Sequence, residues 1–171
     1  MLTRRQFIKA GIVGGVALAA AGAVLWTQRE SHPRLFTLDA EQRALAAALA
    51  SALLAGALPA DANRAGVIEA LVGRVEQAIR GLSASAQKEL SELLALLTFA
   101  PARMVLAGVS KPWSETSSAQ AAEFLQRWRF SRFALPQSAY HALHDLIIGA
   151  WYAEPSAWET IGYNGPPEVL L

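Results

Sequence analysis

Residues 63–80 read NRAGVIEALVGRVEQAIR, and the apolar residues in this stretch recur every three or four positions. That spacing places them on one face of an α-helix. The face is formed by Val67, Ile68, Leu71, Val75 and Ile79. Gly81 follows and is a typical helix end. We therefore expect an amphipathic helix over about Asn63–Arg80, whose apolar face must pack against neighbouring elements.

The same periodicity extends on both sides of this stretch. We expect an earlier helix over Leu38–Ala55, capped by Thr37 or Asp39 and stopped by Gly56 and Pro59. A third helix is expected from Ser83 or Ser85 to near Ala100, where Pro101 closes it. A loop over 108–118 follows, and two further helices are expected over about 118–132 and 136–152. No stretch alternates with period 2 over strand length. The sequence thus predicts an all-α fold, a compact bundle of about five helices.

Composition sets the first limits on function. A chain of 171 residues is long enough to bury one hydrophobic core without disulfides or a structural metal ion to stabilise it. The chain has no cysteine, which excludes disulfides, thiol catalysis and cysteine-based metal sites. The formal net charge is +1, but residues 1–23 hold three bases and no acid. Residues 24–171 therefore hold 15 − 3 = 12 bases against 14 acids, a net of −2. This balance gives no reason to expect nucleic acid as a partner.

The basic N-terminus has the pattern of an export signal. Thr3, Arg4, Arg5, Phe7, Ile8 and Lys9 match the twin-arginine pattern Ser/Thr-Arg-Arg-x-Phe-Leu-Lys, with Ile8 in place of Leu. A charge-free run follows from Ala10 to Trp26, and its four glycines keep it only weakly apolar. We interpret residues 1–23 as a twin-arginine signal peptide with an expected signal helix, and residues 24–36 as a linker.

The predicted signal peptide is either cleaved after export or retained as a membrane anchor. Ala21 and Ala23 form an A-x-A cleavage site, with 19–21 as a competitor, and we favour cleavage. A retained leader would tether the chain to the membrane only weakly, because the run from Ala10 to Trp26 spans about 25 Å as a helix and a bilayer core needs about 30 Å.

Residues 37–171 form the expected helical domain, and residues 154–171 form its tail. The tail can make one capped turn near Pro155, but two glycines and two prolines within residues 162–167 exclude a helix beyond it. Large apolar groups in such a tail need a surface to lie on.

Aromatic residues concentrate toward the C-terminus. Ten of the 14 lie between Trp113 and Tyr163. We expect Phe124, Trp128 and Tyr140 to belong to the core, although Trp128 is also a candidate for partner binding. Tryptophan and tyrosine in loops are typical of binding hot spots, because each buries a large area while losing few rotors. The predicted partner-binding residues are Trp113, Trp128, Tyr152, Pro155, Trp158, Ile161, Gly162, Tyr163, Gly165 and Pro166.

Candidate chemistry is sparse. His141, His144 and Asp145 share a helix face, but a metal site needs three or more ligands and Glu154 is the only nearby acid. We therefore predict no metal site, and the lack of a G-x-S-x-G elbow leaves no catalytic serine to assign. Arg127, Arg129 and Arg132 alternate with aromatic residues over 127–133, which we interpret as a solvated or partner-facing edge where arginine covers aromatic surface.

These features resemble the gluconate 2-dehydrogenase subunit 3 family. The likeness rests on the Thr3–Lys9 signal, on residues 38–42, the 56–59 break, and Phe124, Leu125, Trp128 and Ser131, and above all on the tail. The tail reads Tyr152-x-x-Pro155-x-x-Trp158-x-x-Ile161-Gly162-Tyr163-Asn164-Gly165-Pro166, whereas the usual family ending is Trp-x-x-Ile-Gly-Tyr-Pro-Gly-Pro. Asn164 is thus a departure, although asparagine is compatible with a turn.

The resemblance implies a non-catalytic small subunit of a periplasmic dehydrogenase. Such a subunit escorts a large FAD-dependent flavoprotein of the glucose–methanol–choline (GMC) type, which lacks its own signal, through the twin-arginine translocase and then stabilises it. Electrons pass from the flavin to a c-type cytochrome subunit that carries haem c. The small subunit itself would hold no cofactor and no catalytic residue.

Two rival functions fit the residues without the resemblance. One is an independent periplasmic helical module that binds a small apolar ligand between its helices. The other is a small enzyme that uses His141, His144 and Asp145.

Overall fold

The computed structural model describes residues 36–158, 162, 163 and 165. The chain divides into two units, residues 1–35 and 36–171, and the description that follows concerns the second unit. The predicted signal, its cleavage site and most of the linker lie outside the described residues, as do Ile161 and Pro166.

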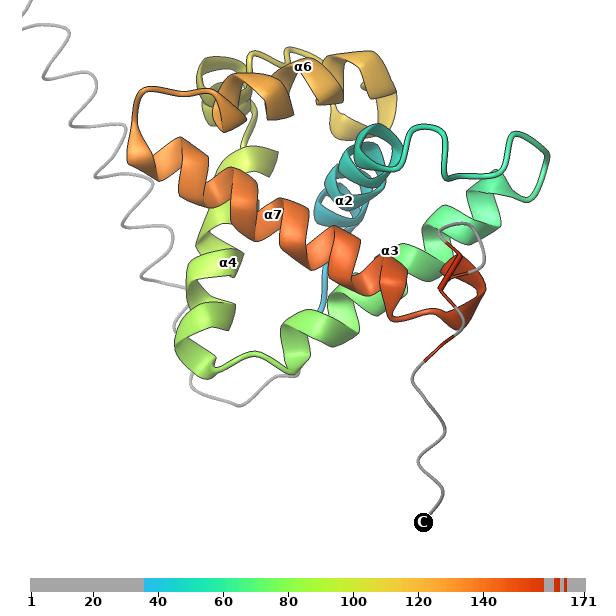
Figure 1. The fold of residues 1–171 in the computed structure, drawn as a ribbon. Coiled ribbons are helices and arrows are strands. Elements are labelled where there is room, and N and C mark those ends of the chain that lie inside the picture. The colour runs from blue at the N-terminus through green and yellow to red at the C-terminus, as the bar shows by residue number, and fades with distance from the viewer. Residues whose placement is uncertain (1–35, 159–161, 164, 166–171) are drawn as a thin grey trace, which may run out of the picture. The chain divides into compact units, whose positions relative to one another are not determined.

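The described residues form helices and no strand, which confirms the all-α prediction (Figure 1). The longer helices are α2 (Ala40–Leu53), α3 (Arg64–Arg80), α4 (Ala84–Thr98), α6 (Ser118–Arg129) and α7 (Ala134–Tyr152). Shorter elements are α5 (Ala100–Ala102), which continues as the π-helix η1 (Arg103–Ala107), and the 3₁₀ turns η2 (Trp113–Glu115) and η3 (Pro155–Ala157). The turn η3 is the single turn that the sequence predicted near Pro155, but the predicted cap is absent, because no side chain among the described residues caps its start.

Side-chain caps determine where three of the helices begin. The Asp39 side chain accepts a hydrogen bond from the Gln42 amide over 2.8 Å, and the Gln42 side-chain oxygen accepts one from the Asp39 amide over 3.1 Å, which completes a capping box. Ser83, the first of its two predicted alternatives, caps α4. Ser117 and Gln120 form a second capping box at α6. In each case the side chains satisfy amides that the first helical turn leaves without a partner.

The segment around Pro101 differs from the prediction. The helix α4 ends at Thr98, and Pro101 lies in the first turn of a new helix, α5, instead of closing the previous one. Proline is tolerated there because first-turn amides have no intrahelical acceptor. The new helix continues as η1 and stops at Gly108, whose φ of +62° favours glycine.

The last two long helices also differ at their ends. The helix α6 stops at Arg129, three residues before the predicted end, and α7 begins at Ala134, two residues before Pro136. Pro136 thus occupies the first turn of α7, where its missing amide costs no intrahelical hydrogen bond.

The core is centred on α2, which packs against α3, α4, α6 and α7. The side chains that are almost fully buried come from every long helix and include Leu45, Leu49, Leu71, Ile79, Leu97, Phe124, Leu143 and Ile147. No single helix among the described residues is long and apolar enough to cross a membrane. The pair formed by α4 and residues 100–107 meets the length and composition requirement only when joined, across a bend of 79°.

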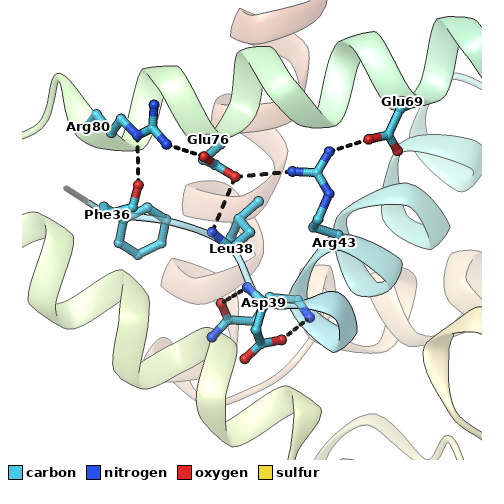
Figure 2. A network of polar contacts seen from close by, with 8 residues as sticks. Phe36, Leu38, Asp39, Arg43, Glu69, Glu76 and Arg80 are labelled. Atoms are coloured by element: carbon cyan, nitrogen blue, oxygen red, sulfur yellow. Dashed lines mark hydrogen bonds and ion pairs between the residues drawn. The ribbon is translucent and has the colours of Figure 1, made fainter. Parts of the chain in front are cut away.

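A partly buried carboxylate fixes the start of the described domain to α3 (Figure 2). The side chain of Glu76 accepts hydrogen bonds from the Leu38 amide over 3.3 Å and from Arg43 over 3.1 Å, and it also pairs with Arg80. Arg80 Nε in turn donates to the carbonyl oxygen of Phe36 over 2.7 Å. Charge-assisted hydrogen bonds of this kind are stronger than neutral ones, so residues 36–43 are held firmly against α3.

Candidate partner-binding surface

Two of the predicted partner-binding residues are core residues. The side chain of Trp113 is 1% exposed, and its indole nitrogen donates to the carbonyl oxygen of Leu97 over 2.8 Å. Trp128 is 9% exposed, and its ring packs edge-on against Phe124 with 4.6 Å between centroids. Burial leaves neither ring available to a partner, which corrects their assignment as contact residues. Phe124, Trp128 and Tyr140 are buried, as predicted for the core.

The tail brings several of the other predicted residues together. The indole nitrogen of Trp158 donates to the carbonyl oxygen of Tyr152 over 2.7 Å, and the Tyr163 amide donates to the carbonyl oxygen of Trp158 over 3.1 Å. The rings of Trp158 and Tyr163 meet edge-on, with 5.4 Å between their centroids. Tyr152 and Tyr163 remain partly exposed, at 38% and 48%, and Pro155 is exposed. The described residues of the tail thus lie against Trp158, with two tyrosines at the surface.

Glycine is required at two positions of this turn. Gly162 and Gly165 have φ of +70° and +94°, values that side-chain-bearing residues rarely adopt. A Cβ added to Gly165 would lie 3.2 Å from the Trp158 ring, whereas a Cβ on Gly162 would meet nothing within 4 Å. Gly165 therefore lies so close to the indole that a side chain at this position would be crowded against the ring.

The helix that leads into the tail is tied to α3. Arg74 Nε donates to the carbonyl oxygen of Ala150 over 3.1 Å, and its guanidinium lies 3.3 Å from a carboxylate oxygen of Glu154. Ala157 in η3 is buried, at 3% exposure. These contacts fix the end of α7 and the first turn after it, so the aromatic turn projects from a rigid base.

A second surface consists of large apolar side chains that the core does not cover. We call it the exposed apolar cluster. From the end of α4 to η1 it includes Phe99, Met104, Val105 and Leu106, and beyond α6 it includes Phe130 and Phe133 in the turn before α7 and Leu135 in the first turn of α7. Val105, Phe130 and Leu135 are 83%, 75% and 80% exposed.

Hydrogen bonds join the end of α6, just before Phe130, to η1, which carries part of the exposed apolar cluster. The indole nitrogen of Trp128 donates to the carbonyl oxygen of Leu106 over 3.1 Å, and Arg127 donates to the carbonyl oxygen of Ala107. The end of α6 therefore lies against η1. The α6–α7 half had a sequence signal in its alternating arginines and aromatics, whereas the η1 half had none, because no helix was expected after Pro101.

Arginines cover part of this aromatic surface. The guanidinium carbon of Arg129 lies 5.2 Å from the ring centre of Phe130, and that of Arg132 lies 4.8 Å from the ring centre of Phe133. Both distances are within the range of cation–π attraction. The predicted covering of aromatic surface by arginine is confirmed for these two pairs, while Arg127 instead bonds to the backbone of η1.

The histidines of α7 do not assemble into a larger site. His144 Nδ1 lies 2.9 Å from a carboxylate oxygen of Asp145, and the ring of His141 lies edge-on to Tyr140 at 5.2 Å. Within residues 36–158 and the described tail positions, no three acidic or histidine side chains are placed to hold a metal ion.

An open groove with a volume of about 690 Å³ lies between α4 and α7, and Ala78 near the end of α3 and Leu82 in the following turn close one side of it. Its walls are mostly aliphatic. Leu90 and Leu93 line it from α4, and Ala139, Ala142 and Leu146 line it from α7. Leu135 belongs both to this groove and to the exposed apolar cluster. The two surfaces therefore adjoin.

Comparison of the chain with protein-family models, with curated proteins and with solved structures found no match in any of the three. The resemblance drawn from the signal and the tail stays a prediction.

Proposed function

We propose that this chain is a non-catalytic small subunit that escorts a large, signal-less flavoprotein through the twin-arginine translocase and then stays bound to it in the periplasm. The observation that carries this proposal is the exposed apolar cluster. Its large apolar side chains come from segments that two hydrogen bonds hold together, and gathered exposed apolar groups of this kind mark protein–protein interfaces. Val105, Phe130 and Leu135 are at least three-quarters exposed, so a partner that covers them would remove much apolar surface from water.

The signal pattern supports the direction of this partnership. Residues 3–9 match the signal of a translocase that carries folded proteins. A GMC-type subunit loads FAD in the cytoplasm and must cross the membrane already folded, so it needs this route. One signal on the small subunit then serves both chains, and electrons leave the flavin for a c-type cytochrome subunit where one is present. A leader that is not cleaved would tether the complex to the inner membrane.

The tail supplies a second contact in this proposal. Tyr152 and Tyr163 present partly exposed rings on a base fixed by Arg74 and Glu154. Rigid tyrosines lose few rotors when they are buried at an interface. We assign the partner-binding role to these tyrosines together with the exposed apolar cluster, and no longer to Trp113 and Trp128.

One observation favours the rival that binds a small apolar ligand. The groove between α4 and α7 has the volume of a typical ligand pocket. Such pockets bury most of their ligand, whereas Ser138, Ala142, Asp145 and Gly149 in this groove are exposed. The open lining is the reason we rank this rival second.

Purification of the tagged full-length chain from the periplasm of its native host tests the proposal. We expect a yellow complex that contains a second, larger chain and shows the absorbance of oxidised flavin. A colourless monomer with a bound apolar molecule would support the rival ligand-binding module instead. Substrate turnover by the isolated small chain would show that it is an enzyme and would refute the escort role.

A further inference from the structure

The groove between α4 and α7 is long enough, and its lining apolar enough, to bind an α-helix. Along α7 it extends from Leu135 to Ala150, which is about 22 Å at the usual helical rise. Its floor contains the buried Leu90 and Ala150, and its α7 wall carries the small residues Ala142 and Gly149. Small residues let a second helix approach closely, because helix axes pack 8–10 Å apart only when the side chains between them allow it. An amphipathic helix that lays its apolar face into a groove is a common recognition mode.

The charges around the groove specify the chemistry of that helix. Only two ionisable residues line the groove, Glu89 on α4 and Asp145 on α7, and both are acidic and exposed. No lysine or arginine is part of the described lining. A helix with an apolar stripe and with lysine or arginine on both flanks would therefore meet an opposite charge at each wall. Charge complementarity of this kind selects the partner more than it adds affinity.

We propose that the α4–α7 groove binds one amphipathic helix of the large flavoprotein, with its apolar stripe on the floor and its basic flanks facing Glu89 and Asp145. This inference rests on the proposed function for the identity of the partner. Leu135 links the groove to the exposed apolar cluster, so one partner can cover both surfaces without a break.

A pair of synthetic helical peptides tests the chemistry of the groove directly. Both peptides carry the same leucine stripe at helical spacing, and they differ only in having lysine or glutamate on the flanks. We expect the full-length chain to bind the lysine peptide at least about 10-fold more tightly than the glutamate peptide. The double variant Glu89→Lys with Asp145→Lys should reverse that order. Equal binding of the two peptides, or binding of neither, would overturn the proposal.

Two matched arginine substitutions test whether the peptide binds in the groove. Ala142→Arg fills the groove at an exposed position of α7, and Ala119→Arg makes the same change at an exposed position of α6 outside it. We expect Ala142→Arg to weaken binding of the lysine peptide at least about 10-fold and Ala119→Arg to leave it unchanged. Equal effects of the two variants, with both chains folded by circular dichroism, would refute the groove as the site.

The same two variants separate this inference from the function on which it rests. If the full-length chain co-purifies with a flavoprotein and Ala142→Arg leaves that complex at its wild-type affinity, the helix assignment fails while the escort role stands. If no flavoprotein co-purifies with the wild-type chain, both fail. Loss of the complex in Ala142→Arg but not in Ala119→Arg supports both.

Discussion

The indole nitrogen of Trp128 lies 3.1 Å from the carbonyl oxygen of Leu106 and donates a hydrogen bond to it. This contact joins a buried ring of α6 to the backbone of η1, a π-helix whose own hydrogen bonding is less regular than that of an α-helix. It also ties the backbone of Leu106 to the end of α6, two residues before Phe130 of the exposed apolar cluster. Trp128 thus helps to position the candidate interface through this hydrogen bond, although its own ring is buried and not available to a partner.

Replacement of Trp128 by phenylalanine should loosen η1. The variant removes a donor from a partly buried carbonyl, so we expect the free energy of unfolding to fall by about 1–3 kcal/mol beyond the effect of the smaller ring. Trp151→Phe is the matched control, because Trp151 is 7% exposed and its indole makes no described hydrogen bond. Urea unfolding measures the difference, and amide exchange should quicken in residues 103–107 only in Trp128→Phe. Equal behaviour of the two variants would show that the hydrogen bond does not hold η1.

The exposed apolar cluster should matter for binding and not for folding. The double variant Phe130→Ser with Phe133→Ser removes two exposed rings and their cation–π contacts, so we expect the free energy of unfolding to change by less than about 1 kcal/mol. The complex with the flavoprotein should weaken by about 2 kcal/mol, roughly 30-fold in Kd. Titration of the purified subunits measures Kd, with Gln137→Ser on exposed α7 surface as the control. A Kd that equals the control value would remove the cluster from the interface.

The helices could be predicted because their signals are local. The spacing of Val67, Leu71 and Val75, followed by Gly81, placed α3 to within one residue. The cap of α4 could be narrowed to Ser83 or Ser85, and geometry then selected Ser83. Pro101 misled the prediction because proline either ends a helix or occupies the first turn of a new one, and the sequence alone does not say which.

The candidate interface was harder to predict, because exposure depends on packing between distant segments. Trp113 sits next to Pro112 in a segment with loop composition, yet its ring is buried in the core. Val105 is as apolar as any core residue and is 83% exposed, because η1 turns it outward. The groove between α4 and α7 had no sequence signal, since it arises from the positions of α4, α7 and the end of α3 and not from the composition of any one of them. The tail is the exception, because the positive φ of Gly162 and Gly165 agrees with the non-helical backbone that its glycines and prolines predicted.

The two tail glycines should respond differently to alanine. Gly162→Ala and Gly165→Ala both place a side chain at positive φ, which costs about 1–2 kcal/mol of local strain. Only Gly165→Ala also brings a Cβ to 3.2 Å from the Trp158 ring. We therefore expect Gly165→Ala alone to break the hydrogen bond from Trp158 to Tyr152, which appears in NMR as rapid solvent exchange of the Trp158 indole proton. Comparable exchange rates in the two variants would mean that Gly165 does not pack on Trp158.

Glu76 should contribute more stability than an exposed acid in an equivalent ion pair. Its side chain is 13% exposed and contacts Arg43, Arg80 and the Leu38 amide. We expect Glu76→Gln to lower the free energy of unfolding by about 1–2 kcal/mol. Glu92→Gln removes an exposed pair with Lys88, separated by 3.8 Å, and should cost no more than about 0.5 kcal/mol. Urea unfolding compares them, and equal losses would contradict a special role for Glu76.

The escort role is tested most directly by the location of the flavoprotein when the signal of this chain is disabled. Arg4→Lys with Arg5→Lys keeps the charge of the leader but removes the arginine pair, and Lys9→Arg is the matched control. Both subunits are tracked by immunoblot in periplasmic and cytoplasmic fractions. In the Arg4→Lys/Arg5→Lys variant we predict that both chains remain in the cytoplasm, still bound to each other and still yellow. A flavoprotein that reaches the periplasm at the wild-type level in this variant would contradict the account.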